Sequence, residues 1–147
     1  MQRFKTSNSM NFECSVESLW DIVSSPNYLN NVHPFCSDNS IIHWDNDKHE
    51  DKIVYLNGLT FVRKFVSWKE FEGYDLWIGS NNRNQSFVEW RLEKVNSGSK
   101  LTITVYPFLY SDWPKVFSFL PYFLFVNIKL KSYLFSVLSG IDWYIKE

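Results

Sequence analysis

The C-terminal stretch from Tyr122 to Lys146 constrains the fold more than any other segment, because it predicts one long helix with a single apolar face. At about 100° per residue, one side of that helix collects an apolar stripe of Phe123, Val126, Leu130, Leu134, Val137, Leu138, Ile141, Tyr144 and Ile145. The opposite side is polar and carries Lys129, Ser132, Ser136 and Ser139. Pro121 suits the first helical position, where its missing N–H would be unpaired in any case. A single amphipathic helix needs a surface to pack against, so the rest of the chain must supply one.

One glycine, Gly140, falls inside this predicted helix. Glycine in a helix interior costs about 1 kcal/mol relative to alanine. We therefore expect Gly140 to permit a close backbone contact or a kink.

The chain before this helix predicts strands and short helices. Residues Arg3 to Cys14 alternate between polar and apolar, as in a half-buried strand. Ser15 is a suitable N-cap for a helix that ends at Ser25-Pro26, and a shorter helix should follow around Leu29. Further strands are expected at Ser40–Asp45, Lys52–Leu56 and Asp75–Gly79, and a final pair of strands should flank Ser97-Gly98. A short helix is expected near Val116.

Two glycine-containing turns predict the registers of two hairpins. Asn57-Gly58 is typical of a type I′ turn, in which Leu56 would face Leu59. Val54 would then face Phe61, and Lys52 would face Arg63. One face of this hairpin would hold Val54, Leu56, Leu59, Phe61, Arg63 and Phe65. A turn at Ser97-Gly98 would pair Leu92 with Ile103 and Trp90 with Val105, giving one apolar and one polar face.

Length and charge narrow the class of protein. The 147 residues predict a single domain spanning 1–147. A formal net charge of -1, with both signs scattered, offers no basic field for nucleic acid, so we expect no nucleic-acid partner. Without the apolar run of a signal peptide the expected location is cytoplasmic, and Cys14 and Cys36 are expected to be free thiols. Pro121, Lys129 and Lys131 interrupt the most hydrophobic run, so no membrane span is predicted, although transient membrane contact remains open.

The order of elements and several local motifs together resemble the START-like, Bet v 1-like or SRPBCC proteins, which include polyketide cyclases. The motifs that carry the resemblance are Leu19-Trp20-Asp21-Ile22-Val23 through Ser25-Pro26, His33-Pro34-Phe35, Tyr55 with Asn57-Gly58, Gly73-Tyr74-Asp75-Leu76, and Tyr133-Leu134 through Gly140 to Trp143-Tyr144. The resemblance covers essentially the whole chain. It implies an α+β helix-grip fold, in which a curved antiparallel sheet of about seven strands wraps a long C-terminal helix, with two short helices after the first strand. It also implies a hydrophobic cavity between sheet and helix. Proteins of this fold include lipid carriers, hormone receptors, quinone-binding proteins and some enzymes, so the fold alone does not define a function.

Arg63 is the most informative candidate residue, because the predicted register buries its charge among apolar side chains. Such a charge is costly unless it is paired. Arg63 could clamp a ligand carboxylate, or it could form an internal ion pair with Asp75 or Asp51. Asn127, which falls inside the apolar stripe, could orient a ligand or bond a neighbouring backbone group.

The histidines and cysteines do not show the spacing of a metal site. His33, His43 and His49 lie on different predicted elements, and Cys36 has no close partner in the sequence. We expect His33 to be a hydrogen-bonded residue at the cavity mouth, and His43 and His49 to be solvated. No nucleophile elbow or phosphate-binding glycine loop is present, so no catalytic residue, cofactor or metal is predicted.

The leading hypothesis is that the chain binds a small hydrophobic or amphipathic ligand, such as a lipid, a quinone or a polyketide-like compound. The expected cavity walls are Phe61, Phe65, Trp90, Ile103, Val105, Leu130 and Leu134, with Arg63, Asn127 and His33 as polar groups. One alternative is a cyclase or dehydratase enzyme that uses the same cavity. A second alternative is an interaction module whose own side chains fill the hollow, in which case the cavity would be well under about 300 Å³.

Overall fold

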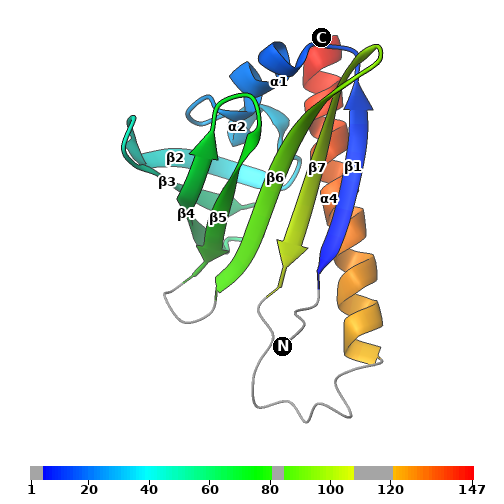
Figure 1. The fold of residues 1–147 in the computed structure, drawn as a ribbon. Coiled ribbons are helices and arrows are strands. Elements are labelled where there is room, and N and C mark those ends of the chain that lie inside the picture. The colour runs from blue at the N-terminus through cyan, green and yellow to red at the C-terminus, as the bar shows by residue number, and fades with distance from the viewer. Residues whose placement is uncertain (1–4, 81–84, 108–120) are drawn as a thin grey trace.

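The computed structural model describes residues 5–80, 85–107 and 121–147, with side chains for all of these except 121–126. In chain order the elements are β1 (Thr6–Phe12), α1 (Val16–Val23), α2 (Leu29–Val32), β2 (Cys36–Trp44), β3 (His49–Tyr55), β4 (Thr60–Lys69), β5 (Gly73–Gly79), β6 (Gln85–Val95), β7 (Gly98–Tyr106) and α4 (Pro121–Lys146) (Figure 1). The strands form one antiparallel sheet in the order β1-β7-β6-β5-β4-β3-β2. The helix expected near Val116 lies outside the described residues.

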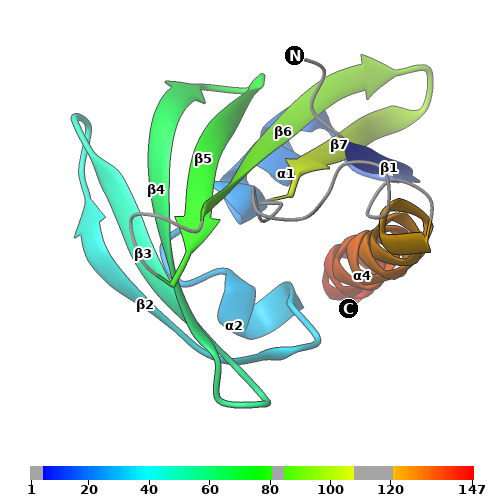
Figure 2. The same cartoon turned by 90° about the horizontal axis from the view of Figure 1, so that it is seen from below.

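The sheet curves strongly, and α2 and α4 lie on its concave side (Figure 2). Helix α4 runs beside β1 and β7, while α2 lies beneath the other half of the sheet. The buried core joins these layers through Leu29 and Val32 of α2, Leu134 and Leu138 of α4, and inward-facing residues of the strands such as Ile103. Within the described residues this is the arrangement that the resemblance predicts, with seven strands, one long helix and two short helices after β1.

Local sequence signals account for the start of α1. The Oγ of Ser15 accepts a hydrogen bond of 3.0 Å from the backbone N–H of Ser18, so Ser15 is the N-cap that the sequence predicts. Leu19, Trp20 and Val23 are buried on one face of the helix. This packing attaches α1 to the end of the sheet nearest the C-terminus of α4 (Figure 1).

Helix α4 uses most of its predicted apolar stripe. Leu134, Val137, Leu138 and Ile141 are buried, but Tyr144 is exposed. Tyr144 lies at the edge of the stripe, one position before Ile145, which packs against the core instead. Among the described residues, no helix is long and apolar enough to cross a membrane.

Gly140 makes the close contact that its position in the helix predicts. A Cβ added to Gly140 would lie 1.8 Å from the backbone carbonyl oxygen of Val32. The backbone of α4 therefore touches the end of α2 directly, and only glycine leaves room for this approach. The contact fixes α2 against α4 on the concave side of the sheet.

The register predicted for the β3–β4 hairpin is wrong by one residue. Phe61 pairs with Ile53 rather than Val54, and Arg63 pairs with Asp51 rather than Lys52. The loop contains three residues instead of two, because only Gly58 has a positive φ, at 90°. The N–H of Gly58 donates to the carbonyl of Tyr55, as in a type I turn followed by a bulge.

Side chains alternate along a strand, so this shift turns β3 over. The prediction that Val54 and Leu56 lie on the concave face is therefore wrong. Asp51 and Ile53 are buried there instead, with Tyr55 next along the strand. This places an acidic side chain directly opposite Arg63.

The β6–β7 pairing differs from the prediction by two residues. Trp90 pairs with Ile103 and Leu92 with Leu101, and the strands meet at the pair Val95 and Gly98. The turn residues are thus one position earlier than Ser97-Gly98. A shift of two keeps every side chain on its predicted face, so the concave side of these strands is apolar as expected.

Candidate functional site

A cavity of about 370 Å³ lies between the concave face of the sheet and helices α2 and α4. Its wall is almost entirely apolar. Eight of the ten predicted site residues line it, namely His33, Phe61, Arg63, Trp90, Ile103, Val105, Leu130 and Leu134. Lining residues that were not among the predicted site residues include Leu29, Ile53, Tyr55, Leu76, Ile78, Val88, Tyr133 and Val137.

The cavity extends toward the end of the sheet that carries the β3–β4 loop. Asn57 and Leu59 both line it and are both exposed, so the rim of the cavity reaches the surface there. The volume exceeds the roughly 300 Å³ below which a typical ligand would not fit. The side chains of the described residues therefore do not fill the hollow.

Phe65 and Asn127, the other two predicted site residues, do not line this cavity. Phe65 packs into an aromatic cluster, where its ring lies 4.9 Å from that of Tyr74 and 5.5 Å from that of Trp44. The side-chain oxygen of Asn127 accepts a 2.8 Å hydrogen bond from the hydroxyl of Thr6. Asn127 thus ties α4 to β1.

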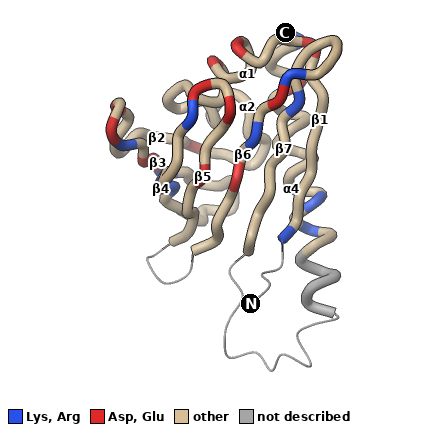
Figure 3. Tube along the Cα trace, in the orientation of Figure 1, with Lys and Arg blue, Asp and Glu red and all other residues tan. Residues whose placement is uncertain are grey.

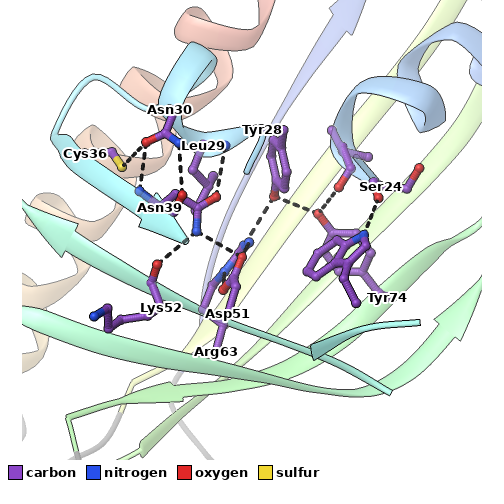
Figure 4. A network of polar contacts seen from close by, with 12 residues as sticks. Ser24, Tyr28, Leu29, Asn30, Cys36, Asn39, Asp51, Lys52, Arg63 and Tyr74 are labelled. Carbon is purple, nitrogen blue, oxygen red and sulfur yellow. Dashed lines mark hydrogen bonds and ion pairs between the residues drawn. The ribbon is translucent and has the colours of Figure 1, made fainter. Parts of the chain in front are cut away.

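Arg63 is held by a buried ion pair with Asp51 (Figure 4). Its Nε and Nη2 donate to the two carboxylate oxygens of Asp51 at 2.8 and 2.6 Å. The Nδ2 of Asn39 donates to the same carboxylate at 3.1 Å. The structure therefore gives Arg63 the second of the two roles left open by the sequence, with Asp51 as its partner.

A chain of hydroxyl groups extends from this ion pair and ends within the protein (Figure 4). Arg63 donates to the Tyr28 hydroxyl at 3.3 Å, and the Tyr28 and Tyr74 hydroxyls lie 2.8 Å apart. Tyr74 donates to the backbone carbonyl of Val23 at 2.9 Å. Because Tyr74 uses its single proton there, Tyr28 must donate to Tyr74, and both hydroxyl protons in this chain have an acceptor.

A second polar group lies on the cavity wall itself. The Nε2 of His33, at the end of α2, is 2.5 Å from the Tyr133 hydroxyl on α4. The Tyr133 hydroxyl is 3.3 Å from that of Tyr55 on β3. The Nδ1 of His33 accepts a 3.2 Å hydrogen bond from the backbone N–H of Phe35. His33 is therefore hydrogen-bonded, as the sequence analysis expected, but it is buried on the cavity wall and does not lie at the mouth.

Burial controls the protonation of this group. Desolvation, reinforced by the positive charge of Arg63, lowers the pKa of His33 to about 4. Desolvation raises the pKa of both Tyr55 and Tyr133, and for Tyr133 the neighbouring phenol adds to the increase. At neutral pH all three side chains are uncharged, so the polar group on the cavity wall consists of neutral hydrogen-bonding atoms.

Charges elsewhere do not suggest another site in the described residues. Lys, Arg, Asp and Glu are interleaved over the strands and turns, with no band of one sign (Figure 3). No cluster of His, Cys, Asp and Glu within the described ranges could hold a metal ion.

Cys14 and Cys36 are both free, as expected. His49 is only partly exposed, because its ring stacks on Trp68 at a centroid distance of 3.6 Å.

No protein-family model matches the chain, and no curated protein matches it. Solved structures do match over nearly the whole chain. A Staphylococcus aureus protein of unknown function has a TM-score of 0.80 at 10% identity, with 99% of this chain and 94% of that one covered. A START superfamily protein from Mycobacterium smegmatis has a TM-score of 0.75 at 11% identity, with 97% of each chain covered. Ara h 8.0201, a Bet v 1 homologue, has a TM-score of 0.69 at 17% identity, with 99% of this chain and 100% of that one covered. The chain therefore has the START/Bet v 1-like helix-grip fold, which confirms the resemblance seen in the sequence.

Proposed function

We propose that this protein binds a small hydrophobic or amphipathic molecule, such as a lipid, a quinone or a polyketide-like compound, in the cavity between its sheet and α4. The observation that carries the proposal is the cavity of about 370 Å³ with its almost entirely apolar wall. Cavities of this size and character are typical of small-molecule sites. The fold adds support, since relatives of the START and Bet v 1 type bind hydrophobic ligands.

The energetic basis of the proposed binding is the removal of apolar ligand surface from water. Each square ångström of apolar surface buried contributes about 25 cal/mol, before the costs of association are subtracted. Trp90, Ile103 and Leu134 provide rigid walls on β6, β7 and α4, because each is itself buried in the core. A wall that is already formed reduces the ordering cost of binding.

Native mass spectrometry of the purified protein, followed by organic extraction and by loading with fatty-acid methyl esters, tests this proposal. A cavity-filling variant, Val105→Trp, should lose bound ligand, because Val105 lines the cavity. The matched control is Val66→Trp, which introduces the same side chain at an exposed position on β4. Failure to detect or load any apolar ligand would contradict the proposal, as would equal loading of the two variants.

The alternative is a cyclase or dehydratase that acts on a polyketide-like chain in the same cavity, and the His33–Tyr133 contact is the observation that favours it. The arrangement limits the chemistry available to His33, since Nδ1 accepts from Phe35 and Nε2 faces Tyr133. The imidazole has no free lone pair with which to act as a base, which leaves Tyr133 as an acid or hydrogen-bond donor. Incubation with a β-keto thioester tests this alternative: a cyclised or dehydrated product that disappears in Tyr133→Phe would favour the enzyme.

A further inference from the structure

The hydrogen bonds around His33 have a fixed direction. The backbone N–H of Phe35 can only donate, so the Nδ1 of His33 accepts at 3.2 Å. In a neutral imidazole the other nitrogen then carries the proton. The Nε2–H of His33 therefore donates to the Tyr133 hydroxyl, 2.5 Å away.

Counting protons shows that one donor is left over. Tyr133 and Tyr55 have one hydroxyl proton each, and a single contact of 3.3 Å joins their oxygens. If Tyr133 donates to Tyr55, the Tyr55 proton has no acceptor among the described residues. If Tyr55 donates to Tyr133, the Tyr133 proton has none. In both arrangements one phenolic O–H on the cavity wall is unmatched.

The hydrogen-bonded chain that begins at Arg63 differs from the one through His33. There the last hydroxyl, that of Tyr74, donates to the backbone carbonyl of Val23, so that chain is closed by the protein. The chain through His33 ends instead at two residues that both line the cavity. The Tyr55–Tyr133 contact is also longer than the usual O–H···O distance of about 2.7 Å. A better acceptor inside the cavity could therefore replace it.

The charges around the cavity determine which acceptor fits. Arg63 is the only charged side chain among the described lining residues, and both carboxylate oxygens of Asp51 already accept from it. An ionised carboxylate in this cavity would lack a free cation and would lose its hydration, which is costly. A neutral acceptor oxygen incurs a far smaller desolvation cost.

We propose that the cavity selects neutral ligands that carry a carbonyl oxygen, which accepts the hydrogen bond left over by the Tyr55–Tyr133 pair. This inference rests on the proposed ligand-binding function and specifies the ligand class for the same site. A ketone, an ester or a quinone can supply this carbonyl, because the recognised feature is the neutral acceptor. The His33 imidazole positions Tyr133 by occupying its acceptor side.

Calorimetric titration with two matched ligands tests the inference. The first is methyl nonyl ketone. The second is the alkene of the same shape, in which C=CH2 replaces C=O. The affinity of each ligand is first corrected for its partition from water into an alkane. After this correction the wild-type protein should bind the ketone about fivefold more tightly than the analogue. The double variant Tyr55→Phe with Tyr133→Phe should lose this preference. Tyr28→Phe removes a buried hydroxyl from the closed chain, so it should keep the preference.

A second measurement covers the case in which the double variant does not fold. Infrared spectra of the ketone with a labelled carbonyl should show a shift to lower wavenumber when it is bound to the wild-type protein, relative to the ketone in alkane. Equal binding of the two ligands with no carbonyl shift would overturn the inference while leaving the ligand-binding function intact. If neither ligand binds, nor any other apolar compound, both proposals are wrong.

Discussion

The guanidinium of Arg63 and the carboxylate of Asp51 form a bidentate pair, with Nε–Oδ1 and Nη2–Oδ2 distances of 2.8 and 2.6 Å. Both residues are buried, at 3% and 0% exposure. A buried pair of this kind contributes little net stability compared with apolar residues of the same shape, but loss of one partner strands the other charge. The pair therefore behaves as part of the scaffold that shapes the cavity wall.

The first prediction concerns this pair. Arg63→Met should lower the free energy of unfolding by about 3 kcal/mol, because it leaves the Asp51 carboxylate buried without a cation. The affinity of a neutral ligand, such as methyl decanoate, should change little. Urea denaturation and calorimetric titration measure the two effects separately.

A double variant provides the control for this prediction. Asp51→Leu combined with Arg63→Met removes both charges and should recover part of the stability lost in the single variant. If Arg63→Met is as stable as the wild type and loses affinity only for acidic ligands, the arginine is a ligand clamp after all.

The second prediction concerns ligand charge. Near pH 8 methyl decanoate should bind more tightly than decanoic acid, because the ionised acid finds no free cation in the cavity. If only the protonated acid binds, its apparent affinity should rise about tenfold for each pH unit lost, down to its pKa of roughly 4–5. The affinity of the ester should stay constant. Titration of both ligands at pH 8, 7 and 6 measures these affinities. Equal affinity of the acid and the ester at all three pH values would contradict the prediction.

The fold could be predicted from the sequence because the strongest patterns are local. The apolar stripe of α4, the Ser15 cap and the polar-apolar alternation of the strands each act within a few residues of the chain. They give the number and order of the elements. The motifs along the whole chain then point to one fold, which the solved structures confirm.

The partner of Arg63 could not be settled in the same way, because it depends on one loop residue. A three-residue loop with only Gly58 at positive φ places Asp51 opposite Arg63, whereas the predicted two-residue turn places Lys52 there. The sequence Asn57-Gly58 fits both loops. Asp51 and Asp75 were both candidates from the sequence, and only the register distinguishes them.

Tyr55 and Tyr133 were missed for related reasons. Tyr55 shares the inward face of β3 with Ile53, which the wrong register had turned outward. Tyr133 lies at the edge of the apolar stripe of α4, one turn before Val137, and its spacing from Val137 was the available signal. Its contact with His33 joins residues 100 positions apart, so no local pattern could reveal it.

The third prediction concerns the contact between α4 and α2. Gly140→Ala should lower the free energy of unfolding by about 2 kcal/mol, because the added methyl group would overlap the carbonyl oxygen of Val32 and force the helices apart. At an ordinary helix position the same change would stabilise the protein by up to about 1 kcal/mol. Ser132→Ala, at an exposed position of the same helix, is the control and should change stability by less than about 0.5 kcal/mol. A rise in melting temperature for Gly140→Ala would show that the contact does not matter.

The last prediction concerns the pH dependence of stability. His33 is 8% exposed, and burial lowers the pKa of its imidazole from 6.5 to about 4. The groups that face it are the neutral phenols of Tyr55 and Tyr133, the N–H of Phe35 and, farther away, the paired guanidinium of Arg63. Between these two pH values the unfolded chain binds a proton at this position that the folded protein does not bind.

The free energy of unfolding should therefore fall as the pH is lowered through this window, by up to about 1.4 kcal/mol per pH unit and about 3 kcal/mol in total. Above about pH 6.5 the histidine contributes no pH dependence, and below about pH 4 its contribution levels off. His33→Gln keeps a donor toward Tyr133 but cannot titrate, so subtracting its unfolding free energies from those of the wild type isolates the histidine. Urea denaturation of both proteins at pH 4, 5, 6 and 7 gives this difference. Parallel curves for the two proteins would mean that His33 has the same pKa in the folded and unfolded chains.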